Sequence, residues 1–265
     1  MQLLYYKIIL GFMDFILKPV YLELVRLYTP NIFGFTKKGF GRKGDGRYIL
    51  PLELLHKLDN IVVLSFGVAD DISFEQDLLK DVPSAKVFCF DPSIDDLPEK
   101  DERIKFSKIG LAGNDIPSKN LFSFATILDK MDLKKPCNLL IKMDIEGWEW
   151  GFLESVDLQK MNVSFFTAEL HVKMYNFYSV FLLPFSIYNK YRILKRISND
   201  YYIFHTHANN YRYTKFKNFI MPDLVELTFI NKAVFYEQIV NDVKELNVTN
   251  VAYQEDFQYP FIHKK

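Results

Sequence analysis

Residues 61–71 read Ile-Val-Val-Leu-Ser-Phe-Gly-Val-Ala-Asp-Asp, a nearly continuous apolar run that ends at a glycine and leads into two acids. A strand buried on both faces of a parallel sheet has this pattern. Gly67 allows the backbone to turn sharply and to approach a ligand closely. We therefore interpret this stretch as the first strand of an α/β sheet, with Ser65, Gly67 and Asp70 beside a ligand. A plain strand-to-helix turn is the alternative.

Strand-like and helical patterns alternate along the rest of the chain. Strands are predicted over residues 86–90, 104–109, 138–143, 164–170, 201–205 and 224–230. Helices are predicted over residues 74–80, 123–131, 148–156 and 184–197. This alternation predicts a doubly wound α/β sheet with helices on both faces, in three layers. Residues 206–222 show no strong helical pattern, so we expect an antiparallel last strand, which needs no helical crossover.

The composition is that of a neutral globular protein. The chain has 265 residues, with 33 Lys and Arg against 33 Asp and Glu, and 49% of its residues are hydrophobic. A balanced charge gives no electrostatic reason to expect a nucleic-acid partner. The two cysteines, Cys89 and Cys137, form no close pair and no CxxC motif. We therefore expect neither a disulfide framework nor a cysteine metal site.

The N-terminal segment is apolar but interrupted by charges. Residues 3–28 are rich in Leu, Ile, Phe and Tyr, and contain Lys7, Asp14, Lys18, Glu23 and Arg26. A spanning helix needs about 20 mostly apolar residues. We therefore expect an amphipathic helix that packs on the domain or contacts a membrane peripherally, with a signal anchor as the alternative.

The domain organisation follows from these patterns. We predict a helical extension over residues 1–38, one globular domain over 39–250 and a tail over 251–265. The sequence favours a cytoplasmic location and leaves a membrane-associated or secretory one open.

Ligands of an open α/β sheet bind beyond the carboxyl ends of its strands. Asp91 ends the second strand and lies 24 positions after Gly67. A carboxylate at this place can accept hydrogen bonds from both hydroxyls of a ribose, and a turn aspartate before Pro92 is the alternative. Gly110 and Leu111 follow the third strand, where a loop closes over an adenine ring or forms a simple glycine turn.

Titratable side chains follow the fourth and fifth strands. Asp144 comes directly after the fourth strand, with Glu146 and Glu149 close behind it. Acids at this place either serve the reaction or stabilise the start of the next helix. Glu169 and His171 end the fifth strand on one face. His171 is either a general base near neutral pH or a hydrogen-bonded structural histidine.

Asp144, Glu169 and His171 are thus the candidate catalytic residues, and Asp144 is also a candidate contact of the ligand. A metal site made by His171, His205 and His207 has no defining ligand spacing. We therefore expect no metal.

Five short segments occur in an order that is known from one family. They are Gly-Asp-Gly-Arg-Tyr (44–48), Ser-Phe-Gly (65–67), Phe-Asp-Pro (90–92), Ile-Lys-Met-Asp-Ile-Glu-Gly-Trp-Glu (141–149) and Glu-Leu-His (169–171). In these segments the chain resembles the FkbM-type methyltransferases, and most closely their methyltransferase-like eukaryotic branch. The resemblance covers residues 40–232, and the element at 141–149 is its most specific part.

The resemblance implies a Rossmann-like class I methyltransferase fold, with strand order 3-2-1-4-5-7-6 and strand 7 antiparallel. It implies S-adenosylmethionine as the cofactor and a hydroxyl oxygen of a small molecule or sugar as the methyl acceptor. The chain departs from the family pattern Asp-x-Gly-Ala-Asn-x-Gly, because residues 65–71 lack the second glycine.

Two other functions fit parts of the sequence. A nicotinamide-dependent oxidoreductase shares the ribose aspartate, but it binds pyrophosphate at the turn where Asp70, Asp71 and Glu75 follow Gly67. Acids are unfavourable beside pyrophosphate and tolerable beside a cationic sulfonium, so this function is disfavoured. A methyltransferase fold that only binds its ligand is the second alternative, because of the missing glycine.

Overall fold

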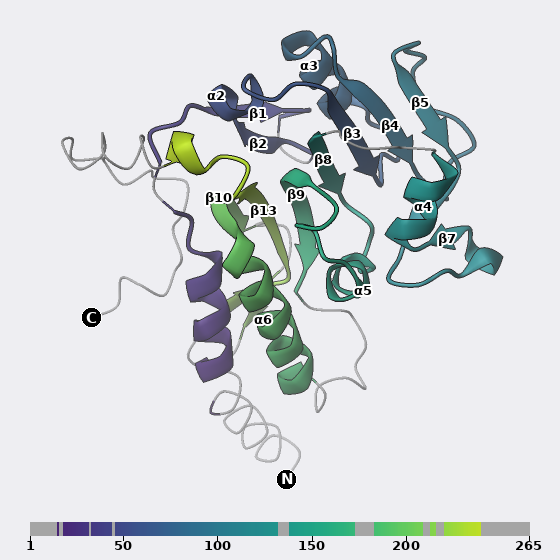
Figure 1. The fold of residues 1–265 in the computed structure, drawn as a ribbon. Helices are drawn as coiled ribbons and strands as arrows, with labels where there is room; N and C mark the ends of the chain where they lie inside the picture. Colours follow the sequence, from purple (N-terminus) through teal and green to yellow (C-terminus); the bar gives the residue numbers. More distant parts are fainter. Residues whose placement is uncertain are drawn as a thin grey trace.

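The computed structural model describes Phe15 and residues 18–31, 33–43, 46–131, 138–172, 183–208, 213–215 and 220–239. Its centre is a seven-stranded sheet in the order β10-β13-β9-β8-β3-β4-β5 (Figure 1). The strands are β3 (Ile61–Phe66), β4 (Lys86–Phe90), β5 (Ile104–Ser107), β8 (Asn138–Met143), β9 (Val163–His171), β10 (Tyr201–Ala208) and β13 (Leu224–Asn231).

Strand β13 is antiparallel to both of its neighbours, β9 and β10. The pairs from β9 through β8, β3 and β4 to β5 are all parallel. With β3 counted as the first strand, the order is 3-2-1-4-5-7-6. The predicted fold class is therefore confirmed, including the antiparallel last strand.

The apolar runs of the sequence form the middle of the sheet because both of its faces are covered. All six residues of β3 are buried. Val62, Leu64 and Phe66 belong to the hydrophobic cluster on one face, and Ile61 and Val63 to the cluster on the other. Side chains alternate between the faces of a strand, so a strand at this place needs apolar residues at every position.

Helices on each face complete the three layers (Figure 1). Helix α3 (Ser73–Asp81) and the short α2 (Leu52–Leu55) contribute Phe74, Leu78 and Leu54 to one cluster. The other cluster is covered by α4 (Phe124–Lys130), α5 (Glu149–Ser155) and α6 (Leu183–Asp200). The side chain of Ser123 accepts a hydrogen bond from the backbone N–H of Thr126 and so caps the start of α4.

A helix over residues 18–28 packs beside α6. It buries Tyr21, Leu24, Val25 and Tyr28, which recur at helical spacing, in the same cluster as α6. No helix within the described ranges is long and apolar enough to cross a membrane. Residues 1–14, Cys137 and the tail at 251–265 lie outside the described residues, and the domain boundaries at 38 and 250 stay predictions.

Several short strands escape the sequence prediction. An antiparallel hairpin of β1 (Lys37–Phe40) and β2 (Tyr48–Pro51) precedes the sheet, and β6 (Gly110–Leu111) pairs with β7 (Leu121–Phe122). In the connection at 206–222, β10 continues to Ala208, and β11 (Tyr213–Lys215) pairs with β12 (Ile220–Pro222). These pieces are too short to show an apolar period, and tertiary partners stabilise them.

Candidate active site

A cleft opens at the carboxyl ends of β3 and β8, under the β1–β2 hairpin. It has a volume of about 480 Å³, including its open mouth. The residues that line it come from the hairpin, the turn after β3, the start of α3 and the end of β8: Arg42, Gly46, Gly67, Val68, Ala69, Asp70, Asp71, Phe74, Lys142 and Asp144. Three of the predicted site residues, Gly67, Asp70 and Asp144, therefore lie together in one cleft.

The turn after β3 packs directly on the end of β8. Gly67 has a φ of +75°, and a Cβ atom at this position would lie 1.6 Å from the carbonyl oxygen of Asp144. Only glycine fits here, for its backbone angle and for its size. The backbone N–H of Gly67 donates to Phe90 (2.9 Å) and that of Asp144 donates to Phe66 (2.9 Å), so three strand ends are joined.

Ala69 and Asp71 stand where the family pattern has asparagine and the second glycine. Ala69 has a φ of +43°, in the left-handed region, whereas the φ of Asp71 is not positive. The position of the missing second glycine is thus occupied in a conformation that any residue adopts. The backbone of this turn does not depend on the glycine that the sequence lacks.

The side chain of Asp91 binds the backbone of the same turn. Its Oδ2 atom accepts hydrogen bonds from the backbone N–H groups of Val68 (3.1 Å) and Ala69 (2.9 Å). Its Oδ1 atom accepts from the N–H (2.8 Å) and the hydroxyl (2.5 Å) of Ser93. Burial acts to raise the pKa of Asp91, but the hydrogen bonds from Ser93, Ala69 and Val68 outweigh it and lower the pKa.

The Asp91 side chain is directed at this turn and not into the cleft. The residue is buried and does not line the cleft. A carboxylate accepts about four hydrogen bonds, and these are all supplied by the protein. Asp91 holds the ligand-binding turn in place, and a ribose contact remains a prediction that needs this carboxylate to exchange a partner.

Three other predicted cofactor contacts are buried away from the cleft. The hydroxyl of Ser65 donates to Oε1 of Glu75, inside the fold. Leu111 is fully buried in a hydrophobic cluster, and Gly110 packs against Pro92. The reason is that residues 110–111 form strand β6 and not a free loop, so neither closes over a ligand in this structure.

Lys142 is a cleft residue that the sequence prediction missed. It lies in the buried strand β8, and its Nζ atom donates to the carbonyl oxygen of Gly67. The same atom lies 5.5 Å from the centre of the Tyr48 ring. Burial raises the pKa of Glu75, although the charge of Lys142 and the Ser65 hydroxyl oppose the shift. A lysine inside an apolar strand was the signal available in the sequence.

Asp144 lines the cleft and carries a buried oxygen without a described hydrogen-bond partner. Its Oδ2 atom lies 3.5 Å from the Tyr48 hydroxyl, at the limit of a hydrogen bond. Its Oδ1 atom is buried and has no hydrogen-bond partner among the described residues. Burial raises the pKa of Asp144; Lys142 opposes this shift, Glu146 and Glu149 add to it, and His171 opposes it.

His171 is held between two carboxylates. Its Nδ1 atom lies 3.0 Å from Oε1 of Glu149, and its Nε2 atom lies 3.4 Å from Oε2 of Glu146. Burial acts to lower the pKa of His171, but the hydrogen bond and charge of Glu149, with the charges of Glu169 and Glu146, raise it to about 9. The imidazole is thus protonated at neutral pH.

The comparison with family models decides which class of protein this is. The model of a family described as a methyltransferase domain matches residues 20–230. The chain belongs to this methyltransferase family. No curated protein matches it. Among solved structures, the crystal structure of a fibrillarin/Nop5p complex matches with a TM-score of 0.39 and 11% identity, over 69% of this chain and 80% of that chain.

The methyltransferase domain brings its candidate catalytic residues to one end of the sheet. The charges of Asp144 and His171 interact, and so do those of His171 and Glu169. One expectation is corrected: His171 is not a neutral base near pH 7, because three carboxylates hold it in the charged form. Asp144 remains as the group with a free acceptor oxygen at the cleft.

The three histidines that the sequence analysis considered for a metal do not form a site. In the described part of the methyltransferase, no group of three or more His, Cys, Asp or Glu could hold a metal ion. Burial lowers the pKa of His205 to about 3, and the charges of Lys37 and His207 act in the same direction. His205 is therefore a neutral side chain of β10.

Proposed function

We propose that this methyltransferase binds S-adenosylmethionine in the cleft at the ends of β3 and β8, and methylates a hydroxyl oxygen of a small molecule or sugar. The observation that carries the proposal is the buried, unpaired Oδ1 atom of Asp144, a residue that lines the cleft together with Gly67. An unpaired buried acceptor is costly unless a ligand supplies the donor.

The residues of the cleft fit a cationic nucleoside cofactor. Gly67 turns the chain beside the cleft with a φ of +75°, at a place where no side chain fits. Asp70, Asp71 and Asp144 give the lining an acidic side, which favours a sulfonium and an ammonium group. When bound, S-adenosylmethionine supplies an electrophilic methyl group.

Asp144 is the residue that we propose as the general base. Burial raises its pKa, and a base whose pKa lies nearer to neutral is more effective. Its carboxylate would take the proton that an acceptor hydroxyl loses when its oxygen is methylated, and its Oδ1 atom has no described hydrogen-bond partner that competes. His171 acts as a fixed positive charge nearby, and Glu169 contributes to holding that charge.

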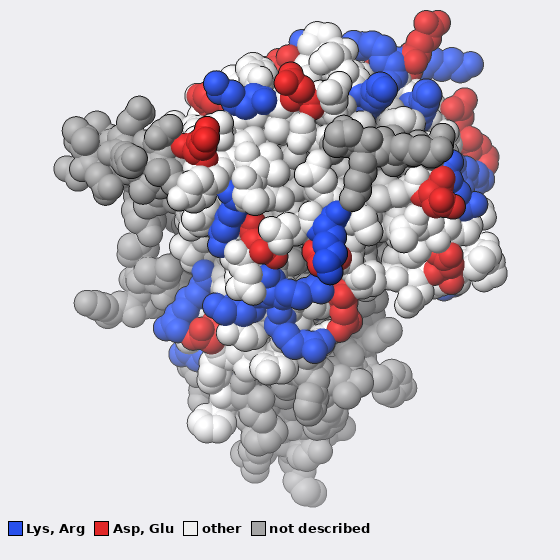
Figure 2. Space-filling model, in the orientation of Figure 1, with Lys and Arg blue, Asp and Glu red and all other residues white. Residues whose placement is uncertain are grey.

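The acceptor class rests on the resemblance to the FkbM-type methyltransferases and on charge. The chain carries 33 Lys and Arg against 33 Asp and Glu, a balance that gives no electrostatic reason for a nucleic-acid acceptor. Figure 2 shows both signs on the visible face, with several Lys and Arg gathered in its lower middle. The overall balance supports a small-molecule or sugar acceptor. We also propose that the segment preceding and including the helix over residues 18–28 contacts a membrane surface peripherally.

A fold that only binds its ligand is the second candidate, because residues 65–71 lack the second glycine. The ordinary backbone angle of Asp71 argues against it, since the turn keeps its form without that glycine. The deciding experiment combines binding of S-adenosylhomocysteine by calorimetry with transfer of radiolabelled methyl groups to a panel of sugars and small alcohols. Binding with transfer that Asp144→Asn abolishes supports the enzyme; binding without transfer to any acceptor favours the second candidate.

A further inference from the structure

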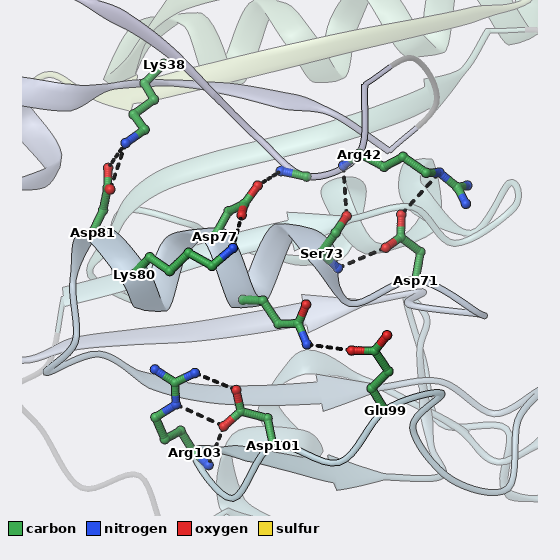
Figure 3. A network of polar contacts seen from close by, with 12 residues as sticks. Lys38, Arg42, Asp71, Ser73, Asp77, Lys80, Asp81, Glu99, Asp101 and Arg103 are labelled. Carbon is green, nitrogen blue, oxygen red and sulfur yellow. Dashed lines mark hydrogen bonds and ion pairs between the residues drawn. The ribbon is translucent and has the colours of Figure 1, made fainter.

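The tip of the β1–β2 hairpin is fastened to α3 by polar contacts. The Nζ atom of Lys38 lies 2.6 Å from Oδ2 of Asp81, and the backbone N–H of Gly41 donates to Asp77 at 3.2 Å (Figure 3). The backbone N–H of Arg42 donates to the hydroxyl of Ser73 at 2.8 Å. These contacts fix the backbone of Arg42 at the mouth of the cleft, whatever its side chain does.

The side chain of Arg42 is free to bind a ligand. Its Nε atom lies 3.5 Å from Oδ2 of Asp71 (Figure 3), and 58% of the side chain is exposed. No described residue forms a hydrogen bond with its two terminal nitrogens. Asp71 is itself held in place, because its Oδ1 atom accepts from the backbone N–H of Ser73 at 2.9 Å.

The two cations of the cleft differ in what they can do. Lys142 is buried, and its Nζ atom is occupied by the carbonyl oxygen of Gly67. Arg42 lies at the open side with Asp71 beside it, so a positive and a negative group are presented together. This pair complements a zwitterion: a carboxylate against the guanidinium and an ammonium against the aspartate.

We propose that Arg42 binds the α-carboxylate of the methionine part of S-adenosylmethionine, with its ammonium group directed to Asp71. Guanidinium and carboxylate match in a two-bond geometry that a neutral or single-donor side chain does not offer. The inference rests on the proposed function, since it names the residue that recognises one end of that cofactor. It makes Arg42 a specificity residue for ligands that carry the amino-acid group.

The test compares two ligands that differ in that group. S-adenosylhomocysteine carries the amino-acid end, whereas 5′-methylthioadenosine lacks it. We expect Arg42→Ala to weaken binding of S-adenosylhomocysteine by about 10- to 100-fold, the range for a hydrogen bond to a charged group. Binding of 5′-methylthioadenosine should not change. Arg42→Met, which keeps the apolar stem, should give the same difference, and Lys43→Ala is the matched control that alters neither affinity.

Each other outcome has a distinct meaning. If both Arg42 variants weaken the two ligands equally, or weaken neither, the assignment of Arg42 is overturned while the proposed cofactor stands. If the wild-type protein binds neither ligand in isothermal titration calorimetry, the proposed function itself is overturned, and the assignment of Arg42 falls with it.

Discussion

The Nδ1 atom of His171 lies 3.0 Å from Oε1 of Glu149, and this contact joins the end of β9 to the first turn of α5. Glu149 is fully buried, and the same oxygen accepts hydrogen bonds from the backbone N–H groups of Ile145 and Gly147. Because the carboxylate is fixed from several sides, it holds the imidazole in its charged form. The stability of the protein should therefore depend on pH.

We expect His171 to stabilise the folded protein at neutral pH and to lose this effect in mild alkali. Its pKa is raised to about 9 in the folded state, against about 6.5 in an unfolded chain. The stabilisation that comes from a raised pKa is complete below the pKa of the unfolded state, and it is lost as the pH rises through the pKa of the folded state. Urea denaturation of wild type and His171→Gln should differ by on the order of 2–3 kcal/mol near pH 6 and converge above about pH 9.

The comparison with His171→Gln is needed because Lys190 acts in the opposite direction. Burial lowers the pKa of Lys190 to about 8, although Glu149 opposes the shift. This lysine makes the folded state more favourable as the pH rises above that value. Its effect is common to both proteins and cancels in the difference. A difference that stays constant across the range would show that His171 is not charged.

Asp144→Asn should separate catalysis from binding. The amide keeps the size of the side chain but cannot take a proton, so methyl transfer should fall by about 10²- to 10⁴-fold. Affinity for S-adenosylhomocysteine, which lacks the sulfonium charge, should fall far less than transfer does, which identifies a transition-state effect. In the wild type, activity should rise with pH around a value above the usual carboxyl range, since burial raises the pKa of Asp144. Glu154→Gln, at an exposed carboxylate that pairs with Arg192 and does not line the cleft, is the control that retains transfer.

Asp91→Ala should destabilise the protein even without any ligand. It leaves the buried N–H of Val68 and the N–H of Ala69 without their acceptor, and an unsatisfied buried donor costs about 1–3 kcal/mol. Thermal unfolding of the apo protein is the measurement. Asp95→Ala, which removes an exposed carboxylate paired with Lys108, should leave the melting temperature unchanged. If the Asp91→Ala and Asp95→Ala variants have the same melting temperature, Asp91 does not stabilise the fold and its role is in ligand binding alone.

Ala69→Gly should stabilise the fold. The φ of +43° at Ala69 lies in the left-handed region, which costs an L-residue roughly 1–2 kcal/mol. Part of the gain is offset by the greater freedom of glycine in the unfolded chain, so an increase of about 1 kcal/mol in unfolding free energy is expected. Ala85→Gly, at a residue without a positive φ, should lower the unfolding free energy instead. Ala69→Asn should also stabilise, because asparagine tolerates this region.

The protein should be released from membranes by an alkaline carbonate wash. On the helix over residues 18–28, Leu22 lies between Lys18 and Arg26 at helical spacing and is 39% exposed, and Phe15, which precedes this helix, is 80% exposed. Apolar residues bordered by basic ones suit the surface of a bilayer and not its interior. Immunoblotting of pellet and supernatant is the measurement. Retention in the pellet would mean that the segment anchors the protein.

The sequence predicts the sheet well because its central strands are buried on both faces. Apolar runs such as residues 61–66 can be identified as buried strands from their own residues, without knowledge of the segments that they contact in the fold. The β1–β2 hairpin was missed because Lys37 and Lys38 show no such pattern; its stability comes from contacts with α3 and the sheet. Convergence of Asp144 and His171 follows from the order of the strands alone.

The states of the site residues could not be predicted in the same way. The direction of Asp91 depends on the N–H groups of a turn more than 20 positions earlier in the sequence. The charge of His171 depends on carboxylates from α5, from the turn before it and from β9. Such contacts are set by tertiary structure, and the spacing of residues in the sequence does not encode them.

The roof of the cleft has a consequence for shortened forms of the chain. Ile49 in β2 accepts a hydrogen bond from the hydroxyl of Thr228 in β13, at 2.7 Å. The hairpin that carries Arg42 over the cleft is therefore joined to β13, the last strand among the described residues. A truncated chain that ends before residue 224 has all of the cleft residues but lacks β13, which together with α3 holds the hairpin in place. Such a chain should bind the proposed cofactor more weakly than the full chain does.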